Sequence, residues 1–247
     1  MPVPKLYGKL APWFHLLTAP ESYAEEAAFY RKTFDDVCAQ RPKTLLELGS
    51  GGGNNASHMK KRFAMTLVDL SPRMLALSKS INPECEHLRG DMRTVRLRRE
   101  FDTVFIHDAI MYMTAEVGLR AAIETAFVHT RPGGAALFVP DYTRETFKPG
   151  THCGGHDEPE SRRGLRYLEW TWDPEPADTQ YDVEFALMLR DEDGAVRLER
   201  DHHIFGLFAR REWLRFLRDA GFRARAVRFK HSELVVANEV FVGMKPE

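Results

Sequence analysis

An α/β fold is what the sequence predicts: one mostly parallel sheet covered by helices on both faces, with an antiparallel β insertion late in the chain. Two observations support it. Over residues 43–142, short apolar strands alternate with helical segments, the pattern of a parallel sheet. Over residues 143–206 the helices disappear, and strand-like segments follow one another. We therefore expect two kinds of sheet in this chain of 247 residues.

Residues 1–42 are predicted to form an N-terminal helical arm. The apolar positions in residues 23–40 have helical spacing, and Pro20 with Glu21 is typical of a helix start. Before this helix, residues 13–17 form an apolar, aromatic cluster. We expect this part of the arm to fold over another part of the molecule.

Residues 43–142 are predicted to form the core of the α/β fold. The expected strands are 44–48, 64–69, 85–89, 101–106 and 135–140. The expected helices are 54–62, one that begins at Ser71-Pro72, and 115–130. Serine is a favoured N-cap residue and proline a favoured first helical residue, which explains why Ser71-Pro72 is typical of a helix start.

Residues 143–206 are predicted to form the β-rich insertion. Residues 143–160 are rich in glycine, proline and histidine and are expected to form a loop. The strands expected after this loop are 165–172, 181–190 and 195–205. The Asp-Glu-Asp-Gly segment at 191–194 is typical of a hairpin turn, so these strands should be antiparallel.

Residues 207–247 are predicted to complete the core. A helix is expected at 211–220, with Gly221 as its C-terminal cap. Two strands, 224–229 and 239–244, follow it. Their connection is too short for a crossover helix with its loops, so we expect an antiparallel pair.

The composition argues against several classes of protein. Charged residues make up 29% of the chain but nearly cancel, giving a formal net charge of -1, so no broad surface for nucleic acid or anionic membrane is expected. The three cysteines are odd in number and far apart, which argues against a disulfide framework and favours a reducing cytoplasm. No apolar run is long enough to span a bilayer, and no signal peptide is recognised at the start.

A glycine-rich loop follows the first predicted strand. Glycines let the chain turn sharply and let a ligand approach the backbone, although a plain tight turn is the alternative. The dinucleotide-binding pattern G-x-G-x-x-G requires glycine where this chain has Asn54, so that pattern fails. The pattern present is acidic-x-G-x-G-x-G, with Glu47 at its head and glycines at 49, 51, 52 and 53.

Carboxylates also follow the second and third predicted strands. Asp69 ends the second strand, where a carboxylate can accept both hydroxyls of a ribose. Asp91 follows the third strand, where it can accept an exocyclic amine while Met92 lies against an adenine ring. These groups fall at the carboxyl ends of parallel strands, where ligands bind in open α/β sheets.

In this order, the motifs resemble those of the class I S-adenosylmethionine-dependent methyltransferases. The series continues with Leu70 to Leu75 after Asp69, and with Phe101-Asp102 and Arg131-Pro132-Gly133-Gly134. The resemblance covers residues 43–140 and the terminal strands. It implies a Rossmann-like sheet of seven strands, with the last strand antiparallel.

The same resemblance implies a binding site for S-adenosyl-L-methionine. Asp69 should bind the ribose hydroxyls, Asp91 the adenine amine, and His107 the methionine end or the region of the sulfur. Tyr23 is the candidate for the cofactor carboxylate. The implied cofactor contacts are Tyr23, Glu47, Gly49, Ser50, Gly51, Gly53, Asp69, Leu70, Met74, Asp91, Met92 and His107.

A looser resemblance is to small-molecule methyltransferases, including the deoxysugar and glycine-type N-methyltransferases. It depends on the β insertion, the aromatic arm and Tyr112-Met113 after the fourth strand. It implies that the arm and the insertion cap the acceptor site. His107 and Tyr112 are the candidates for catalytic residues that orient the acceptor. The candidate substrate contacts are Trp13, His15, Asp141, Tyr142, His152, His156 and Trp170.

Other histidines were weighed against metal and pocket roles. His152, Cys153 and His156 are ligand types for zinc, but no fourth donor is evident, so no metal is expected. His202 and His203 lie side by side on a predicted strand, where neighbours point to opposite faces. At most one of them can therefore face the pocket.

The sequence thus predicts methyl transfer from S-adenosylmethionine to N or O of a small metabolite. The reaction is an in-line displacement, so the protein mainly aligns the acceptor and excludes water. The alternatives are C-methylation, transfer of a modified group, and a non-catalytic cofactor-binding partner subunit. A nucleic-acid methyltransferase is disfavoured by the near-neutral charge. No membrane partner is expected, and a homodimer is left open.

Overall fold

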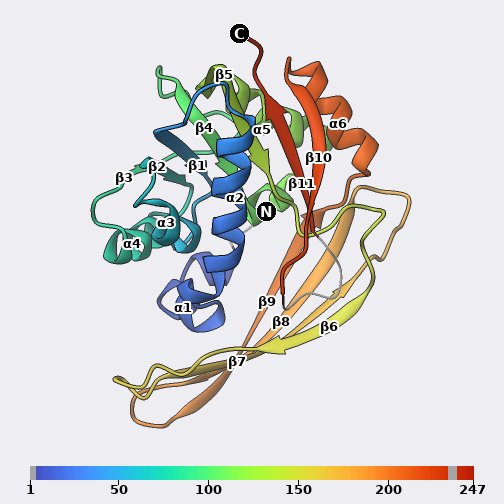
Figure 1. Ribbon diagram of the computed structural model, residues 1–247. Helices are drawn as coiled ribbons and strands as arrows, with labels where there is room; N and C mark the ends of the chain where they lie inside the picture. Colours follow the sequence, from blue (N-terminus) through green and yellow to red (C-terminus); the bar gives the residue numbers. More distant parts are fainter. Residues whose placement is uncertain (1–3, 233–237) are drawn as a thin grey trace.

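The computed structural model describes residues 4–232 and 238–247 and has two sheets (Figure 1). The larger sheet has seven strands in the order β10-β11-β5-β4-β1-β2-β3. All of its pairs are parallel except those made by β11, which is antiparallel to both β5 and β10. The strands are β1 (Thr44–Leu48), β2 (Ala64–Asp69), β3 (Glu86–Arg89), β4 (Phe101–Ile106), β5 (Thr130–Phe138), β10 (Arg223–Phe229) and β11 (Asn238–Met244).

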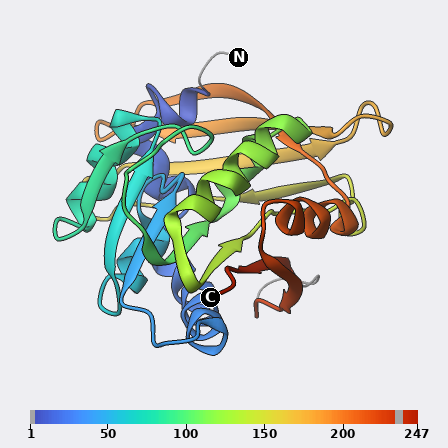
Figure 2. The same ribbon diagram turned by 90° about the horizontal axis from the view of Figure 1, so that it is seen from above.

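Helices cover both faces of the larger sheet, which is why its central strands are apolar on both sides. The helices α2 and α3 pack with Leu45 and Phe105 on one face, and α5 and α6 pack with Leu46 and Val104 on the other. Figure 2 shows α5 and α6 on the same side of the sheet. The helices are α2 (Ala24–Val37), α3 (Asn54–Met59), α4 (Pro72–Ile81), α5 (Glu116–His129) and α6 (Arg210–Asp219).

The second sheet is antiparallel, has the order β6-β7-β8-β9, and extends below the larger sheet in Figure 1. Its inner face carries Leu165, Leu187 and Leu189, which belong to the same apolar cluster as the larger sheet and α5. The insertion and the core therefore share one hydrophobic interior. The strands are β6 (Gly150–Gly154), β7 (Gly164–Trp172), β8 (Gln180–Arg190) and β9 (Val196–Gly206).

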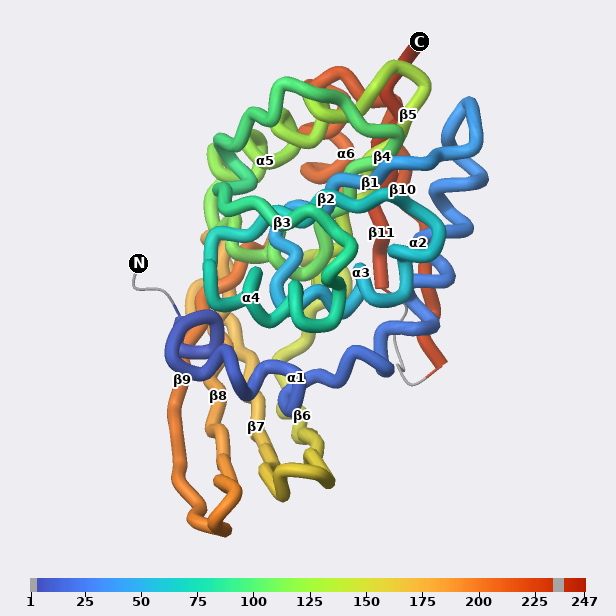
Figure 3. Tube along the Cα trace, turned by 90° about the vertical axis from the view of Figure 1, so that its left-hand side faces the viewer, coloured from blue at the N-terminus to red at the C-terminus, as the bar shows by residue number. Residues whose placement is uncertain are grey.

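The N-terminal arm runs between the two sheets before it reaches α2 (Figure 3). It consists of short turns, and its Leu10, Trp13 and Leu16 join the shared apolar cluster. Burial of these side chains, rather than helix propensity, holds such short turns in place. The elements of the arm are the 3₁₀ turns η1 (Lys5–Tyr7), η2 (Ala11–Trp13) and η3 (Pro20–Tyr23) and the helix α1 (Phe14–Leu17).

The predicted fold class is confirmed: a seven-stranded Rossmann-like sheet with its last strand antiparallel, a separate antiparallel sheet and an N-terminal helical arm. Two details of the prediction were wrong. Residues 150–154 were predicted as loop but form β6, an edge strand whose only sheet partner among the described residues is β7. Its sequence has no apolar alternation, so only the neighbouring strand defines it. Residues 131–134, predicted as a helix stop, already belong to β5.

Candidate active site

The glycine loop between β1 and α3 has the backbone geometry that its sequence requires. Gly49, Gly51 and Gly53 have φ values of 75°, 52° and 79°, in the left-handed region that favours glycine. A Cβ at Gly49 would also lie 2.4 Å from the Cβ of Ala109, which follows β4. Glycine at position 49 therefore lets the loop pack directly against the segment after β4.

Two buried polar atoms, one near the end of β1 and one in this loop, have no hydrogen-bond partner among the described residues. They are Oε2 of Glu47 and Oγ of Ser50. Burial raises the pKa of Glu47 to about 8, while His107 opposes this shift. Because an unsatisfied buried polar group is costly, these atoms indicate a place for a polar ligand, and the ammonium group of an amino acid would fit Glu47. The donor set thus fits the methionine part of S-adenosylmethionine.

Asp69 at the end of β2 is held toward the loop by backbone amides. Its Oδ2 accepts a hydrogen bond from Gly51 N (2.9 Å), and its Oδ1 accepts one from Ser71 N (2.8 Å). Each carboxylate oxygen keeps a free lone pair, so Asp69 can still accept two ribose hydroxyls. The neighbouring Leu70 is 55% exposed, and Met74 is fully buried beside Gly51. An exposed leucine at this edge fits one side of an adenine ring.

Asp91 after β3 is paired with a nearby arginine. Arg93 binds both of its carboxylate oxygens, with Nε–Oδ1 and Nη2–Oδ2 distances of 3.0 and 2.5 Å. The hydrogen bond from Arg93 lowers the pKa of Asp91, so the group stays ionised and keeps lone pairs for an amine. Met92, the next residue, lies against Gly49. Both residues therefore lie at the same sheet edge as Glu47 and Asp69.

The N-terminal arm crosses the glycine loop. Nε2 of His15 lies 3.1 Å from the carbonyl oxygen of Gly52, and the ring of Phe14 occupies the space that a Cβ at Gly52 would need. The side-chain amide of Asn54 donates a hydrogen bond to the carbonyl of Thr18 (3.1 Å). His15, predicted to contact substrate, therefore lies on the glycine loop.

His107 follows β4 and lies between two acids. Its Nδ1 is 2.9 Å from Oδ1 of Asp108, and its Nε2 is 3.3 Å from Oε1 of Glu26 and 3.2 Å from the hydroxyl of Tyr30. Burial alone would lower the pKa of His107, but the two carboxylates raise it well above its ordinary value. The ring of Tyr23 lies 6.1 Å from the imidazole. The raised pKa favours the protonated imidazole, which can bind both carboxylates.

Three carboxyl groups from three elements interact beside His107. The Asp141 carboxyl donates a hydrogen bond to Asp108, and burial together with Asp108 raises the pKa of Asp141 well above its ordinary value. Burial would raise the pKa of Asp108, but His107 lowers it. Burial also raises the pKa of Glu169 on β7. We call Asp108, Asp141 and Glu169 the acid cluster. Asp108 keeps 48% of its side-chain surface exposed, so a ligand can reach this cluster.

Tyr112 lies at the end of the 3₁₀ turn η4 (Asp108–Tyr112), beyond the acid cluster. Its hydroxyl lies 2.6 Å from Nδ1 of His203 on β9 and donates a hydrogen bond to the hydroxyl of Tyr7 in the arm (3.0 Å). Of the two adjacent histidines on β9, His203 faces inward and is buried, whereas His202 is exposed beside Asp182. The predicted alternation of this pair is thus observed.

Aromatic rings of the insertion and of the segment after β5 surround this region. Tyr142 packs edge-to-face against Phe147 and Tyr181, with ring centroids 5.4 and 5.8 Å apart. His152 on the edge strand is exposed and pairs in register with Glu169. Tyr142 and His152 therefore border the acid cluster.

Comparison with known proteins identifies this arrangement. A family model described as a methyltransferase domain matches residues 45–134. The dTDP-3-amino-3,4,6-trideoxy-α-D-glucopyranose N,N-dimethyltransferase of Streptomyces venezuelae is 28% identical over 217 residues, covering 86% of each chain. The dTDP-3-amino-3,6-dideoxy-α-D-glucopyranose N,N-dimethyltransferase of Streptomyces fradiae is 28% identical over 180 residues, covering 72% of this chain and 69% of the relative. The chain contains a methyltransferase domain, and it is an S-adenosylmethionine-dependent methyltransferase.

Solved structures share the fold of this methyltransferase. DesVI of Streptomyces venezuelae superimposes with a TM-score of 0.85 at 24% identity, covering 96% of this chain and 98% of that one. The sugar N-methyltransferase KedS8 from Streptoalloteichus sp ATCC 53650 gives a TM-score of 0.80 at 21% identity, covering 100% and 95%. S-adenosylmethionine is the cofactor of the methyltransferase, and the acceptor is N or O of a small molecule.

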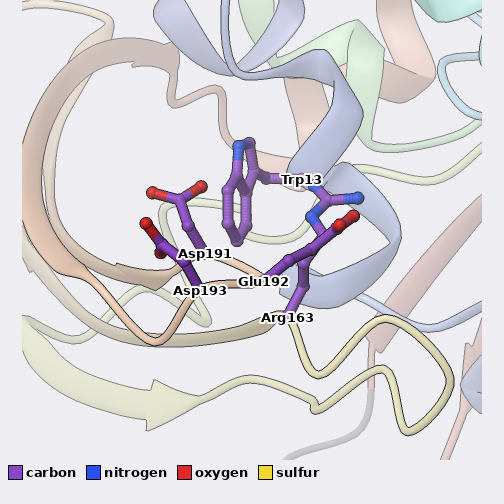
Figure 4. A pocket seen from close by; sticks show the side chains of 5 residues that line it. All are labelled: Trp13, Arg163, Asp191, Glu192 and Asp193. Atoms are coloured by element: carbon purple, nitrogen blue, oxygen red, sulfur yellow. The ribbon is translucent and has the colours of Figure 1, made fainter.

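Two predicted substrate contacts of the methyltransferase lie elsewhere. Trp13 packs under the guanidinium of Arg163, 4.2 Å from its ring centroid, beside a hollow of about 460 Å³ whose other lining residues are acidic (Figure 4). Trp170 is 54% exposed on the outer face of the insertion, because its strand neighbours Glu169 and Thr171 face inward. The structure thus places Trp13 beside Arg163 and Trp170 on the outer face of the insertion. The backbone amide of His156 donates to the carbonyl of Leu16 and ties the insertion to the arm.

Several residues of the site were missed by sequence reasoning. Glu26 and Tyr30 lie one turn apart on α2, so both side chains can contact His107. The sequence does not show which face of α2 packs against β4, and therefore did not indicate this contact. Glu169 and His203 alternate with outward-facing residues on their strands. The sequence indicates this alternation, but it does not show which of the two faces points inward. Tyr7 lies in a 3₁₀ turn with no periodic signal.

Proposed function

We propose that this methyltransferase transfers methyl groups to the amine of an amino sugar carried on a nucleoside diphosphate. The observation that supports the choice of an amine most directly is the acid cluster of Asp108, Asp141 and Glu169. The two curated relatives described above act on dTDP-linked 3-amino sugars, which supports the sugar.

The acid cluster suits an amine better than a hydroxyl. An amine enters largely as an ammonium ion, which ionised Asp108 attracts. It must lose its proton before it can act as a nucleophile, and a carboxylate with a raised pKa, such as Glu169, accepts that proton more readily than an ordinary one. A hydroxyl has no positive charge to compensate the acids, and the histidine beside them is held in its protonated form.

The remaining residues divide the work between cofactor and acceptor. Glu47, Ser50 and Asp69 would hold the methionine and ribose parts of S-adenosylmethionine, which supplies an electrophilic methyl group when bound. His107 keeps Asp108 in place through a 2.9 Å contact. Tyr112 and Tyr142 border the acceptor. In this arrangement the protein aligns the amine with the methyl group and excludes water.

The test is product analysis. The purified protein is incubated with S-adenosylmethionine and each of the two dTDP-3-amino sugars on which the relatives act, and mass spectrometry is expected to show one or two added methyl groups on the amine. As a control, dTDP-sugars with a hydroxyl at the same carbon should remain unmodified. Glu169→Gln is expected to lower kcat/KM by about 10² because the proton acceptor is lost. Methylation of carbon or oxygen instead would contradict the proposal.

We further propose that the protein forms a homodimer through the outer face of the insertion sheet. Several exposed large apolar residues gather on this face, which is unusual for a surface that stays in water: Leu168, Trp170, Met188, Val196 and Leu198.

No helix within residues 4–232 and 238–247 is long and apolar enough to cross a membrane. The cytoplasmic location and the absence of nucleic-acid binding stay predictions from composition.

A further inference from the structure

A chain of polar groups links the N-terminal arm to Tyr112. Asp201 and His203 lie two residues apart on β9, so both point to the inner face of the insertion sheet. Nδ1 of His203 is 2.6 Å from the hydroxyl of Tyr112, and its Nε2 is 3.1 Å from Oδ2 of Asp201. Asp201 also accepts the backbone amides of Lys5 (3.0 Å) and Leu6 (2.7 Å). One carboxylate therefore binds the arm and lies against the imidazole.

The environment of His203 argues for a specific polar role. The imidazole is buried among aromatic rings, with centroids of Tyr7, Phe185 and Phe205 at 5.9, 5.2 and 5.7 Å. A phenylalanine would suit such surroundings for packing alone, because a buried polar ring costs free energy unless both nitrogens find partners. Nδ1 of His203 has the Tyr112 hydroxyl as its partner, whereas Nε2 lies 3.1 Å from Oδ2 of Asp201 and makes no hydrogen bond within the described residues.

We propose that His203, in contact with Asp201, is a positioning residue that fixes the Tyr112 hydroxyl for the acceptor, and that the arm completes this part of the site. The Tyr112 hydroxyl donates its proton to Tyr7 and, with His203 beside it, keeps a lone pair for a donor group of the acceptor. Because Tyr7 and the amides held by Asp201 belong to the arm, the acceptor side of the site forms only when the arm is docked.

Two substitutions at position 203 separate the two contacts of the ring. In His203→Asn the amide reaches the position of Nδ1 and can still bond Tyr112, whereas in His203→Gln it reaches the position of Nε2 and keeps only Asp201. With a dTDP-3-amino sugar as acceptor, His203→Gln is expected to lower kcat/KM about tenfold or more through misplacement of Tyr112, and His203→Asn to keep most of it. Affinity for S-adenosylhomocysteine should stay unchanged in both, which also shows that they fold.

Matched variants exclude indirect effects. His202→Gln, on the outer face of the same strand, should leave kcat/KM unchanged. Tyr112→Phe combined with His203→Gln should be no slower than Tyr112→Phe alone, because the histidine acts through the hydroxyl. Equal losses in the Asn and Gln variants, or additive losses in the double variant, would overturn the proposal.

The kinetic tests above rest on the proposed function, because they use an amino sugar as acceptor. A second measurement needs no acceptor and therefore tests this inference separately. The ¹⁵N chemical shift of Nδ1 of His203 should move in Tyr112→Phe, and the amides of Lys5 and Leu6 should exchange hydrogen faster in Asp201→Asn. If the wild-type protein methylates neither sugar, the proposed function fails while these shifts still decide the inference. Unchanged shifts and exchange rates would refute it.

Discussion

At the scale of single residues, the sheet edge that carries Glu47 and the glycine loop contains groups that cost free energy when no ligand is bound. Glu47 is a buried acid with an unpartnered oxygen, and burial raises its pKa to about 8. Gly49 has a positive φ and no room for a Cβ beside Ala109. Such unsatisfied or strained positions are common at functional sites. Here they mark the place where the cofactor would restore the missing interactions.

Proton release should reveal the contact between Glu47 and the cofactor. Near pH 7 Glu47 is largely protonated, because its pKa of about 8 lies above this pH. Binding of a ligand ammonium favours the carboxylate, so binding of S-adenosylhomocysteine should release up to about one proton to the buffer. Calorimetry in two buffers of different ionisation enthalpy measures this release. Glu47→Gln should release none, and equal release from both proteins would contradict the assignment.

The same raised pKa has a defined effect on stability. The folded protein binds the Glu47 proton more tightly than the unfolded chain, whose pKa is near the ordinary 4.5. The contribution of this group to the free energy of unfolding therefore falls as the pH rises from about 4.5 to about 8, and it is constant above that range. Without ligand, Glu47→Gln should lose this part of the pH dependence.

At the scale of elements, the N-terminal arm joins the cofactor edge to the insertion. Asp201 holds its beginning, Ser71 at the start of α4 donates to the carbonyl of Tyr7 (2.7 Å), and Gly52 meets His15. The arm has little regular structure of its own, so its position depends on these contacts. This explains how a short segment can contact both the glycine loop and the insertion.

Ser71 has two roles that a single substitution can test. Its hydroxyl accepts the amide of Met74 as the N-cap of α4 and also donates to Tyr7. Ser71→Ala should lower the free energy of unfolding by about 1 kcal/mol through loss of the cap, measured by urea denaturation. Hydrogen exchange in residues 5–8 should also become faster. Ser80→Ala on the same helix is the control, and equal effects of both variants would refute the special role of Ser71.

At the scale of the whole molecule, the insertion is a wall with two different faces. Its inner face joins the apolar cluster of the core and carries Glu169, Asp201 and His203. Its outer face exposes Trp170 and Leu198, which nothing in the described chain covers. Because side chains alternate along a strand, the inner face carries the proposed acceptor site and the outer face carries the proposed dimer surface.

The proposed dimer is tested by changing the outer face alone. Light scattering should give twice the mass of the chain for the wild-type protein, and the mass of a monomer for Trp170→Glu combined with Leu198→Glu. Burying two carboxylates in an apolar interface is costly, whereas in a monomer both stay in water. A wild-type monomer, or an unchanged dimer in the double variant, would contradict the proposal.

Sequence alone determined the order of the elements in the larger sheet, because hydrophobic periodicity and turn residues are local. The glycine loop, Asp69 and Asp91 could be placed at one edge since parallel strands bring their carboxyl ends together. The tertiary structure decided which faces meet. On α2, it turned Glu26 and Tyr30 toward His107. It also brought Asp141 and Glu169 close to Asp108. On the insertion, it placed His203 next to Tyr112 and Trp170 on the surface. The periodicity of a sequence shows that side chains alternate between two faces of an element, but it does not show which face is buried. Contacts between segments that are distant in the sequence decide that.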